Sequence, residues 1–278
     1  MNRIIIFFTV LSFSVQAQVN LNFDKRFVEC EDKWVAFKVD EDGSHQYGFI
    51  YIDDQAGLTL NSEGTFKPKN DGSFEISKME GANIKVRLEP NNVKVAIIPE
   101  KLFKDLQIKK IPEWLKLYKT DINTAKRQYK WGFMYNGWNE CEKALSFLLK
   151  AKDLDPEFEG LAVEIAFSYN CLEDYYKAIE ILEYEIKTNP SNAYVNKEYI
   201  FSVTKTDNIE KATTQFYNSI KTIKKDPYQA ENCFNIMQFY YIQKDKDNFN
   251  KWYTELKKWP NENKQIDQYA ELMKKDLN

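Results

Sequence analysis

Histidine, the side chain that enzymes use most often to move protons, is scarce in this 278-residue sequence. His45 is the single histidine, and the run Asp40–His45 has the acidic and small residues of a hairpin turn. Most serine, cysteine and zinc mechanisms depend on histidine, so a single imidazole in an expected solvated turn argues against them. The sequence also lacks a nucleophile elbow, a phosphate-binding loop and a dinucleotide fingerprint. We therefore predict no catalytic residue, no metal site and no cofactor.

Pairs of carboxylates are the remaining type of catalytic group. Glycosidases place two acids about 5 to 9.5 Å apart on either side of a sugar bond. Asp53 and Asp54 are adjacent, and adjacent residues on a strand point to opposite faces, so this pair cannot converge. An enzyme with an unrecognised carboxylate site in the N-terminal part stays open as one hypothesis.

The N-terminus indicates export. Residues 1–3 provide a short charged start, residues 4–15 form an apolar run, and small residues precede a cleavage point after Ala17. We expect residues 1–17 to be a signal peptide and the protein to be periplasmic or extracellular. No other stretch approaches the roughly 18 apolar residues of a membrane span. The formal net charge of −3 shows no basic surplus, so we expect no nucleic-acid partner.

Residues 19–105 are predicted to form an antiparallel β-rich domain, because short β-branched and aromatic runs alternate with turn residues. The expected strands are Trp34–Val39, Tyr47–Ile52, Gly57–Leu60, Thr65–Lys67, Ser73–Ile76, Ile84–Leu88 and Val93–Ile98. Charged and apolar residues alternate in the last two, which predicts a hairpin with one buried face. Short helices are expected over 99–106 and 108–118, and a helical joint between the two parts is expected over 106–124.

The C-terminal part has an internal period of 34 residues. Ala144, Ala178 and Ala212 are spaced by this period, as are Tyr135 and Tyr169, and Pro156 and Pro190. Four residues after each alanine stands a large apolar residue: Leu148, Leu182 or Phe216.

This pattern resembles the tetratricopeptide repeat family. The family's pattern has a large residue, a small one, tyrosine, alanine, an aromatic residue or leucine, and proline. In the first repeat these positions hold Trp131, Gly132, Tyr135, Ala144, Leu148, Ala151 and Pro156. In the second they hold Ile165, Ala166, Tyr169, Ala178, Leu182 and Pro190. The third repeat is degenerate, with Ile200 and Val203 at the small and tyrosine positions. In the fourth, aligning Phe249 with Tyr175 puts Trp252 at the alanine position.

The resemblance implies antiparallel helix pairs that approach closely where small residues meet. Proline after each second helix ends it, because proline lacks the amide donor. The implied repeats are 125–158, 159–192, 193–227 and 228–260, followed by a capping helix at 262–277 with Ile266, Tyr269 and Met273 on its apolar face. The predicted fold class is α+β, an N-terminal antiparallel β-rich domain followed by an all-α solenoid of helical hairpins.

The four cysteines, Cys30, Cys141, Cys171 and Cys233, do not have the spacing of a metal site. In the repeat register Cys141 lies near the start of a second helix and Cys171 near the end of the next first helix. Such ends are neighbours, and export favours oxidation. Two alternatives remain: a disulfide between them, which needs α-carbons within about 7 Å, or separate thiols.

The resemblance also implies a binding groove formed by the first helices. Its positions map to Lys126, Tyr129, Phe133, Asn136, Gly160, Val163, Phe167, Asn170, Tyr194, Lys197, Phe201 and Thr204. This set predicts a partner with apolar or aromatic side chains, whose backbone Asn136 and Asn170 would hydrogen-bond. Alternatively, the aromatic residues pack between repeats or under the β-rich domain.

Three functions follow from these predictions. The leading one is an exported scaffold that holds a peptide or protein segment in the groove. The second is a purely structural component of an envelope assembly or a homo-oligomer. The third is the carboxylate enzyme considered above.

Overall fold

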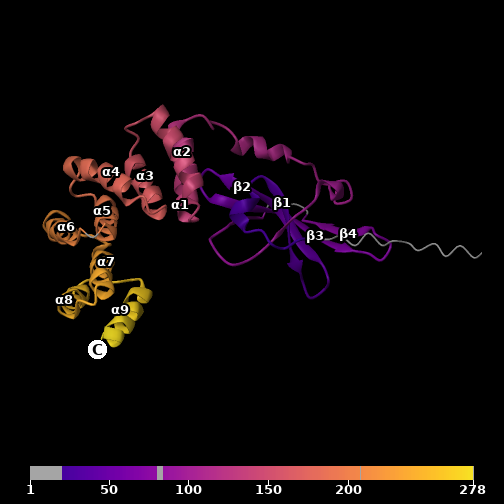
Figure 1. The fold of residues 1–278 in the computed structure, drawn as a ribbon. Coiled ribbons are helices and arrows are strands. Elements are labelled where there is room, and N and C mark those ends of the chain that lie inside the picture. Colours follow the sequence, from indigo (N-terminus) through magenta and orange to yellow (C-terminus); the bar gives the residue numbers. More distant parts are fainter. Residues whose placement is uncertain (1–20, 80–83, 207, 278) are drawn as a thin grey trace, which may run out of the picture. The chain divides into compact units, whose positions relative to one another are not determined.

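The computed structural model describes residues 21–79, 84–206 and 208–277 (Figure 1). The predicted signal peptide lies outside these ranges. The chain divides into two compact units, one ending at Thr120 and the other beginning at Asp121. Each unit is therefore described by itself.

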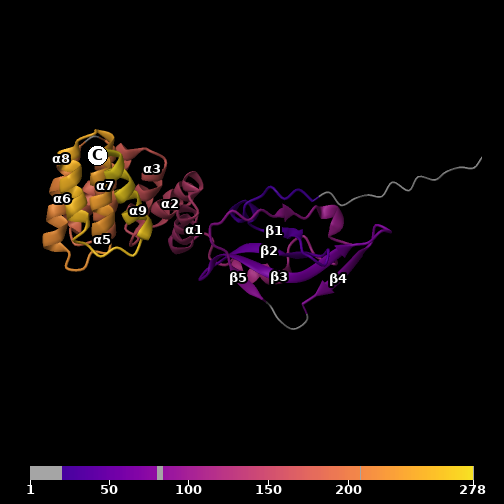
Figure 2. The same cartoon turned by 90° about the horizontal axis from the view of Figure 1, so that it is seen from below.

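The first unit is built on an antiparallel sheet. Its strands are β1 (Lys33–Val39), β2 (His45–Asp53), β3 (Gly57–Pro68), β4 (Phe74–Lys78), β5 (Lys85–Arg87) and β6 (Ala96–Ile97). The strand order is β4-β3-β2-β1-β6, and β5 also pairs with β3 (Figure 2). The predicted antiparallel β-rich fold is thus confirmed for this part of the chain.

Two predictions about strand pairing are wrong. Glu63 and Gly64 stand between the predicted strands Gly57–Leu60 and Thr65–Lys67, but they lie within the continuous strand β3, where a bulge skips Glu63 between two pairs with β2. Gly64 has φ 149°, and a Cβ there would lie 2.1 Å from the Ser77 carbonyl oxygen, so glycine is required at this close approach. The expected hairpin of the last two strands is also absent, because β5 pairs with β3 and β6 pairs with β1.

One face of the sheet is covered by the segment that was expected to join the two parts. Leu106, Ile108 and Leu115 are buried against the aromatic face formed by β1, β2 and β3. The indole nitrogen of Trp34 donates to the Lys109 carbonyl oxygen at 2.8 Å, which fixes this segment on the sheet. Residues 106–118 therefore belong to the first unit and cover its core. They contain a 3-10 helix, Glu113–Tyr118, which starts after Pro112, and Glu100–Leu102 is likewise a short 3-10 helix.

The second unit is a solenoid of helical hairpins (Figure 1). The first helices of the four hairpins are α1 (Ala125–Gly137), α3 (Leu161–Cys171), α5 (Ala193–Lys205) and α7 (Gln229–Ile242). The second helices are α2 (Cys141–Leu154), α4 (Tyr175–Thr188), α6 (Ile209–Thr222) and α8 (Lys246–Leu256), and α9 (Lys264–Leu277) follows them. Each first helix contacts its own second helix and the first helix of the next hairpin. The predicted tetratricopeptide-like solenoid, and with it the α+β fold class, is confirmed.

The small residues of the repeat pattern lie where helices approach most closely. Ala144, Ala178 and Ala212 have no exposed surface. A Cβ added to Gly132 would lie 2.4 Å from Leu148 Cγ and 3.1 Å from the Ala144 carbonyl oxygen. The α1–α2 distance therefore depends on the absence of a side chain at this position.

A backbone hydrogen bond at each inter-helix turn gives the register of the repeats. The amides of Glu140, Asp174, Asn208 and Asp245 each donate to the carbonyl five residues earlier, that of Tyr135, Tyr169, Val203 or Tyr240. From one hairpin to the next, the donor of this bond moves 34 residues along the chain in the first two steps and 37 residues in the third. The fourth hairpin is therefore shifted by three residues relative to the predicted alignment, and Phe249, not Trp252, occupies the alanine position.

Both of these large side chains are buried in the fourth hairpin. Phe249 is fully buried, and the Trp252 ring packs edge-on against Phe216 of the third hairpin at 5.0 Å. The capping helix α9 buries Ile266 and Ala270 against this core. Tyr269, predicted on the apolar face of α9, is 54% exposed, because Ala270 takes the inward position.

Candidate binding face of the first helices

The predicted groove residues, which lie on or next to α1, α3 and α5, fall into three classes by exposure: buried, partly buried and exposed. Asn136, Asn170, Val163 and Thr204 are buried, whereas Tyr129, Phe167, Tyr194, Lys197 and Phe201 are partly buried. Lys126, Phe133 and Gly160 are exposed, and Phe133 keeps 56% of its surface. The face open to a partner is therefore narrower than the predicted groove.

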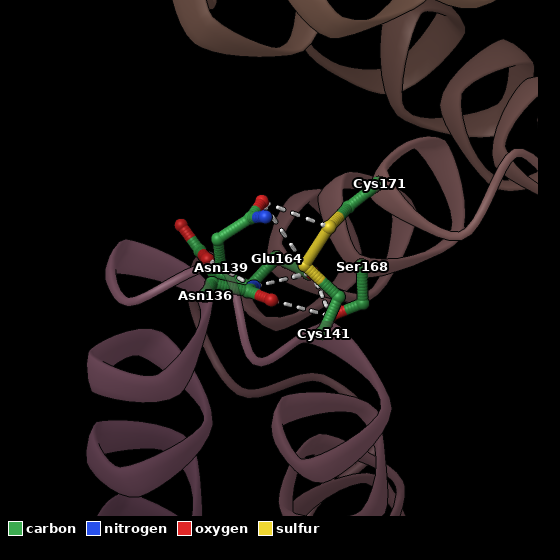
Figure 3. Close-up of a disulfide and its surroundings, with 6 residues drawn as sticks. All are labelled: Asn136, Asn139, Cys141, Glu164, Ser168 and Cys171. Carbon is green, nitrogen blue, oxygen red and sulfur yellow. Dashed lines mark hydrogen bonds between the residues drawn. A yellow bond between two sulfur atoms is a disulfide. The ribbon is translucent and has the colours of Figure 1, made fainter. Parts of the chain in front are cut away.

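The buried asparagines are already used within the protein. Asn136 Nδ2 donates to the Glu164 carboxylate at 2.8 Å and to the Glu164 carbonyl oxygen at 3.0 Å. Ser168 Oγ donates to Asn136 Oδ1 at 2.8 Å (Figure 3). Every polar atom of this amide side chain thus has a partner. The structure gives Asn136 partners within the protein, whereas the sequence suggested the backbone of a bound segment as its partner.

The same network recurs one repeat later. Asn170 Nδ2 donates to the Glu198 carboxylate at 2.9 Å, and Ser202 Oγ donates to Asn170 Oδ1 at 2.7 Å. The residues involved are each 34 positions after their counterparts. The repetition of glutamate and serine at this period is therefore visible in the sequence, although these positions are not among those that define the family pattern. These bonds join α1 to α3 and α3 to α5, and they stabilise the contacts between neighbouring first helices.

At the third contact, between α5 and α7, this network is absent among the described residues. In the 37-residue register, Thr204 replaces the asparagine and Asn235 replaces the glutamate. Thr204 Oγ1 donates to the Phe201 carbonyl oxygen, and Asn235 Nδ2 has no hydrogen-bond partner among the described residues. A pocket of about 150 Å³ lies at this point, lined by Thr204, Lys205, Asn235, Gln238, Phe239, Ile242 and Gln243.

Burial shifts the pKa of the ionisable side chains beneath the predicted groove. Burial raises the pKa of Glu164, and hydrogen bonds from Asn136 and Tyr194 oppose that shift. Lys197 Nζ lies 2.8 Å from Glu198 Oε1 and 3.6 Å from Glu231 Oε1. Burial alone would lower the pKa of Lys197, but these two carboxylates raise it. Lys197 therefore stays charged and neutralises acids within the protein.

Three phenylalanines on this face, exposed Phe133 and partly buried Phe167 and Phe201, form a row that we call the Phe row. They occupy the same position on α1, α3 and α5, and in the 37-residue register Gln238 of α7 follows them. Phe133 stacks with Tyr129 at 6.3 Å, and Phe201 lies edge-on to Tyr175 at 6.2 Å. The rings therefore have neighbours on the protein but remain partly open to a ligand.

A disulfide joins the first two hairpins at one end of this face. It links Cys141, at the start of α2, to Cys171, at the end of α3, with α-carbons 6.2 Å apart. Figure 3 shows it together with the Asn136 network, and Asn139 Oδ1 lies 3.3 Å from Cys171 Sγ. Cys30 and Cys233 are buried thiols, and burial raises the pKa of Cys30 to about 11.

The residues considered for catalysis have structural contacts. His45 is the first residue of β2, not a solvated turn residue, and its ring lies between Phe23 and Phe66. Its Nδ1 donates to the Phe37 carbonyl oxygen at 2.8 Å. Asp53 Oδ1 accepts the amides of Gln55 and Ala56 in the turn after β2. No group of His, Cys, Asp and Glu among the described residues could hold a metal ion, and no described helix is long and apolar enough to cross a membrane.

No family model and no curated protein matches the sequence. Among solved structures, a crystal structure of MamA is 18% identical, covers 52% of this chain and 83% of its own, and has a TM-score of 0.43. MamA 41-end from Desulfovibrio magneticus RS-1 is 15% identical, with coverages of 58% and 84% and a TM-score of 0.43. YrrB, described as a TPR protein with an unusual peptide-binding site, is 18% identical, with coverages of 51% and 70% and a TM-score of 0.42. At this level of similarity we draw no argument about function from them.

Proposed function

We propose that this protein is an exported scaffold that holds a peptide or protein segment on the Phe row. The observation that carries the proposal is the exposure of Phe133, 56%, at one end of three phenylalanines placed at equal intervals on neighbouring helices. A large exposed aromatic side chain is a frequent anchor for a partner. Its repetition on α3 and α5 extends that anchor into a row.

Two members of the Phe row lie outside the buried cluster of the later repeats. Among the described residues, Phe167 and Phe201 belong neither to the buried cluster that runs from Val163 to Ala270 nor to the half-buried side chains packed against it. This favours a role in binding over the alternative that the aromatic residues serve only to pack the repeats.

Two observations support export. Residues 1–17 have the composition of a signal peptide, and Cys141 and Cys171 are placed as a disulfide. Disulfides persist in oxidising compartments outside the cytosol. Fractionation of cells that express the full chain, with detection of the cleaved protein, tests this part of the proposal.

The binding role is tested by capture of partners from a cell-envelope extract on immobilised protein lacking residues 1–17. The test variant combines Phe133→Ala with Phe167→Ala, and the matched control is Tyr184→Ala, since Tyr184 is 63% exposed on the second helix α4. We expect the phenylalanine variant to lose the partner, and the control to retain it, while both melt close to the unmodified protein.

Unchanged recovery by the phenylalanine variant would contradict the binding role. Recovery of nothing but the protein's own chain, at a size above that of one copy, would favour the structural alternative.

A further inference from the structure

We propose that the segment held on the Phe row is acidic, adopts the polyproline II conformation and presents an apolar residue at every third position. This inference rests on the proposed binding function and specifies the chemistry of the partner. It follows from the spacing of the row, the polar groups at its end and the charges around it.

The spacing of the row is set by helix packing. Helices α1, α3 and α5 contact one another in sequence, and packed helices have axes about 8–10 Å apart. Equivalent side chains on them are therefore separated by about the same distance. A polyproline II helix has three residues per turn and advances about 9 Å per turn, so one side of it meets the row at every third residue.

Other backbone conformations fit this spacing less well. A β-strand returns to the same face after about 7 Å, which is too short for one residue per phenylalanine. An α-helix returns after about 5–6 Å or about 10–11 Å, and it uses its own backbone groups for internal hydrogen bonds. A polyproline II segment leaves those groups free to bond the protein.

Amide side chains stand where such bonds are needed. Gln238 continues the Phe row on α7 and lines the pocket of about 150 Å³ together with Thr204 and Asn235. Asn235 Nδ2 is a donor without a partner among the described residues. A buried donor of this kind costs free energy unless it is paired. A backbone carbonyl of the bound segment would pair it once the pocket side chains that cover Nδ2 move aside.

The charges on the first helices favour an acidic segment. The acidic residues of α1, α3 and α5 are Glu164 and Glu198, and both are buried, with exposures of 2% and 3%. On α7 the acidic residue is Glu231, which lies 3.6 Å from Lys197 Nζ. Lys126, about two turns before Phe133 on α1, and Lys205, about one turn after Phe201 on α5, are exposed. Lys205 Nζ also lies over the Phe201 ring, 5.2 Å from its centroid. Carboxylates between the apolar residues of the segment would therefore meet cations.

The test uses labelled synthetic peptides of about twelve residues, four turns of polyproline II, with the folded protein lacking residues 1–17. The first peptide repeats the triplet leucine–proline–glutamate. The second has the same composition with leucines at alternate positions. The third replaces glutamate by lysine, and the fourth is an acidic amphipathic helix without proline. Affinity is measured by fluorescence anisotropy at low and high salt.

We expect the first peptide to bind at least about tenfold more tightly than each of the others, and to weaken at high salt. Phe167→Ala and Phe201→Ala should each weaken it about tenfold or more, whereas Tyr184→Ala should not. Equal binding of the first two peptides, tighter binding of the helical or the basic peptide, or no binding of the first peptide overturns the inference.

Failure of this inference can be told apart from failure of the proposed function. If the peptides show no preference for the triplet but capture of the envelope partner still depends on Phe133 and Phe167, only the polyproline II assignment falls. If capture is also independent of these residues, the binding role of the Phe row falls with it.

Discussion

Gly132 allows the closest contact of the repeat pattern to be tested with a single methyl group. A Cβ at this position would lie 2.4 Å from Leu148 Cγ and 2.6 Å from Leu148 Cδ2. Leu148 is fully buried, so its branch point has little room to retreat. The substitution Gly132→Ala therefore requires α1 and α2 to move apart.

Two opposing contributions set the size of the effect. Alanine is favoured over glycine in a helix by about 0.8–1 kcal/mol. Overpacking a core position costs about 1–3 kcal/mol. The second hairpin has Ala166 in the same place opposite Leu182, so a slightly wider spacing of the two helices is accessible. We therefore expect a net loss of about 1 kcal/mol, which lowers Tm by about 2–4 °C in a domain of this size.

The matched control is Gly137→Ala in the same helix. No atom lies within 4 Å of a Cβ built on Gly137, so this change should raise stability by about 0.4–1 kcal/mol through the unfolded state. Thermal and urea unfolding of both variants measure the difference. If both substitutions stabilise the protein, the close contact at Gly132 does not exist. A double mutant with Leu148→Ala should show a favourable coupling if Leu148 is the residue displaced.

Other positions give further predictions. Ala178→Leu should cost about 1–3 kcal/mol, because Ala178 has no exposed surface, while Lys177→Leu on the exposed face should change Tm little. Mass spectrometry after alkylation of the unreduced, unfolded protein should find Cys141 and Cys171 unmodified; alkylation of both would rule out the disulfide. Burial raises the pKa of Glu164 above 4.5. Between pH 4.5 and this higher pKa, the folded state therefore keeps a proton on Glu164 that the unfolded state has lost. Stability should therefore fall as pH rises from 4.5 through the folded-state pKa, and Glu164→Gln should remove this part of the pH dependence in unfolding measured from pH 4 to 7.

The helical repeats could be predicted from the sequence because their constraint is local. Helices of one hairpin can approach closely only at small residues, so Gly132, Ala144 and Ala178 are visible as residue types at fixed intervals. Prediction failed in the fourth hairpin, where three additional residues shift the register. The large residues Phe249 and Trp252 gave no sign of which one faced the neighbouring helix.

In the first unit the sequence predicted where strands lie better than how they pair. Turn residues such as Gly43 and Gly72, which have φ of 84° and 83°, mark the ends of strands directly. Pairing depends on residues far apart in the chain, so neither the bulge at Gly64 nor the pairing of β5 with β3 could be read from alternation. Alternation likewise predicted a buried side for Ile84–Leu88, yet Ile84 and Val86 on that side are exposed and Leu88 is buried.

The 34-residue period places Phe133, Phe167 and Phe201 on equivalent sites of successive helices, so the positions of the candidate binding face could be read from the sequence. Which side chains on that face are exposed depends on the tertiary structure. Asn136 and Asn170 look like free amides in the sequence, but their partners lie 28 and 32 residues further along the chain. A hydrogen bond depends on atoms brought within about 3 Å, and packing of one repeat on the next is what brings them together.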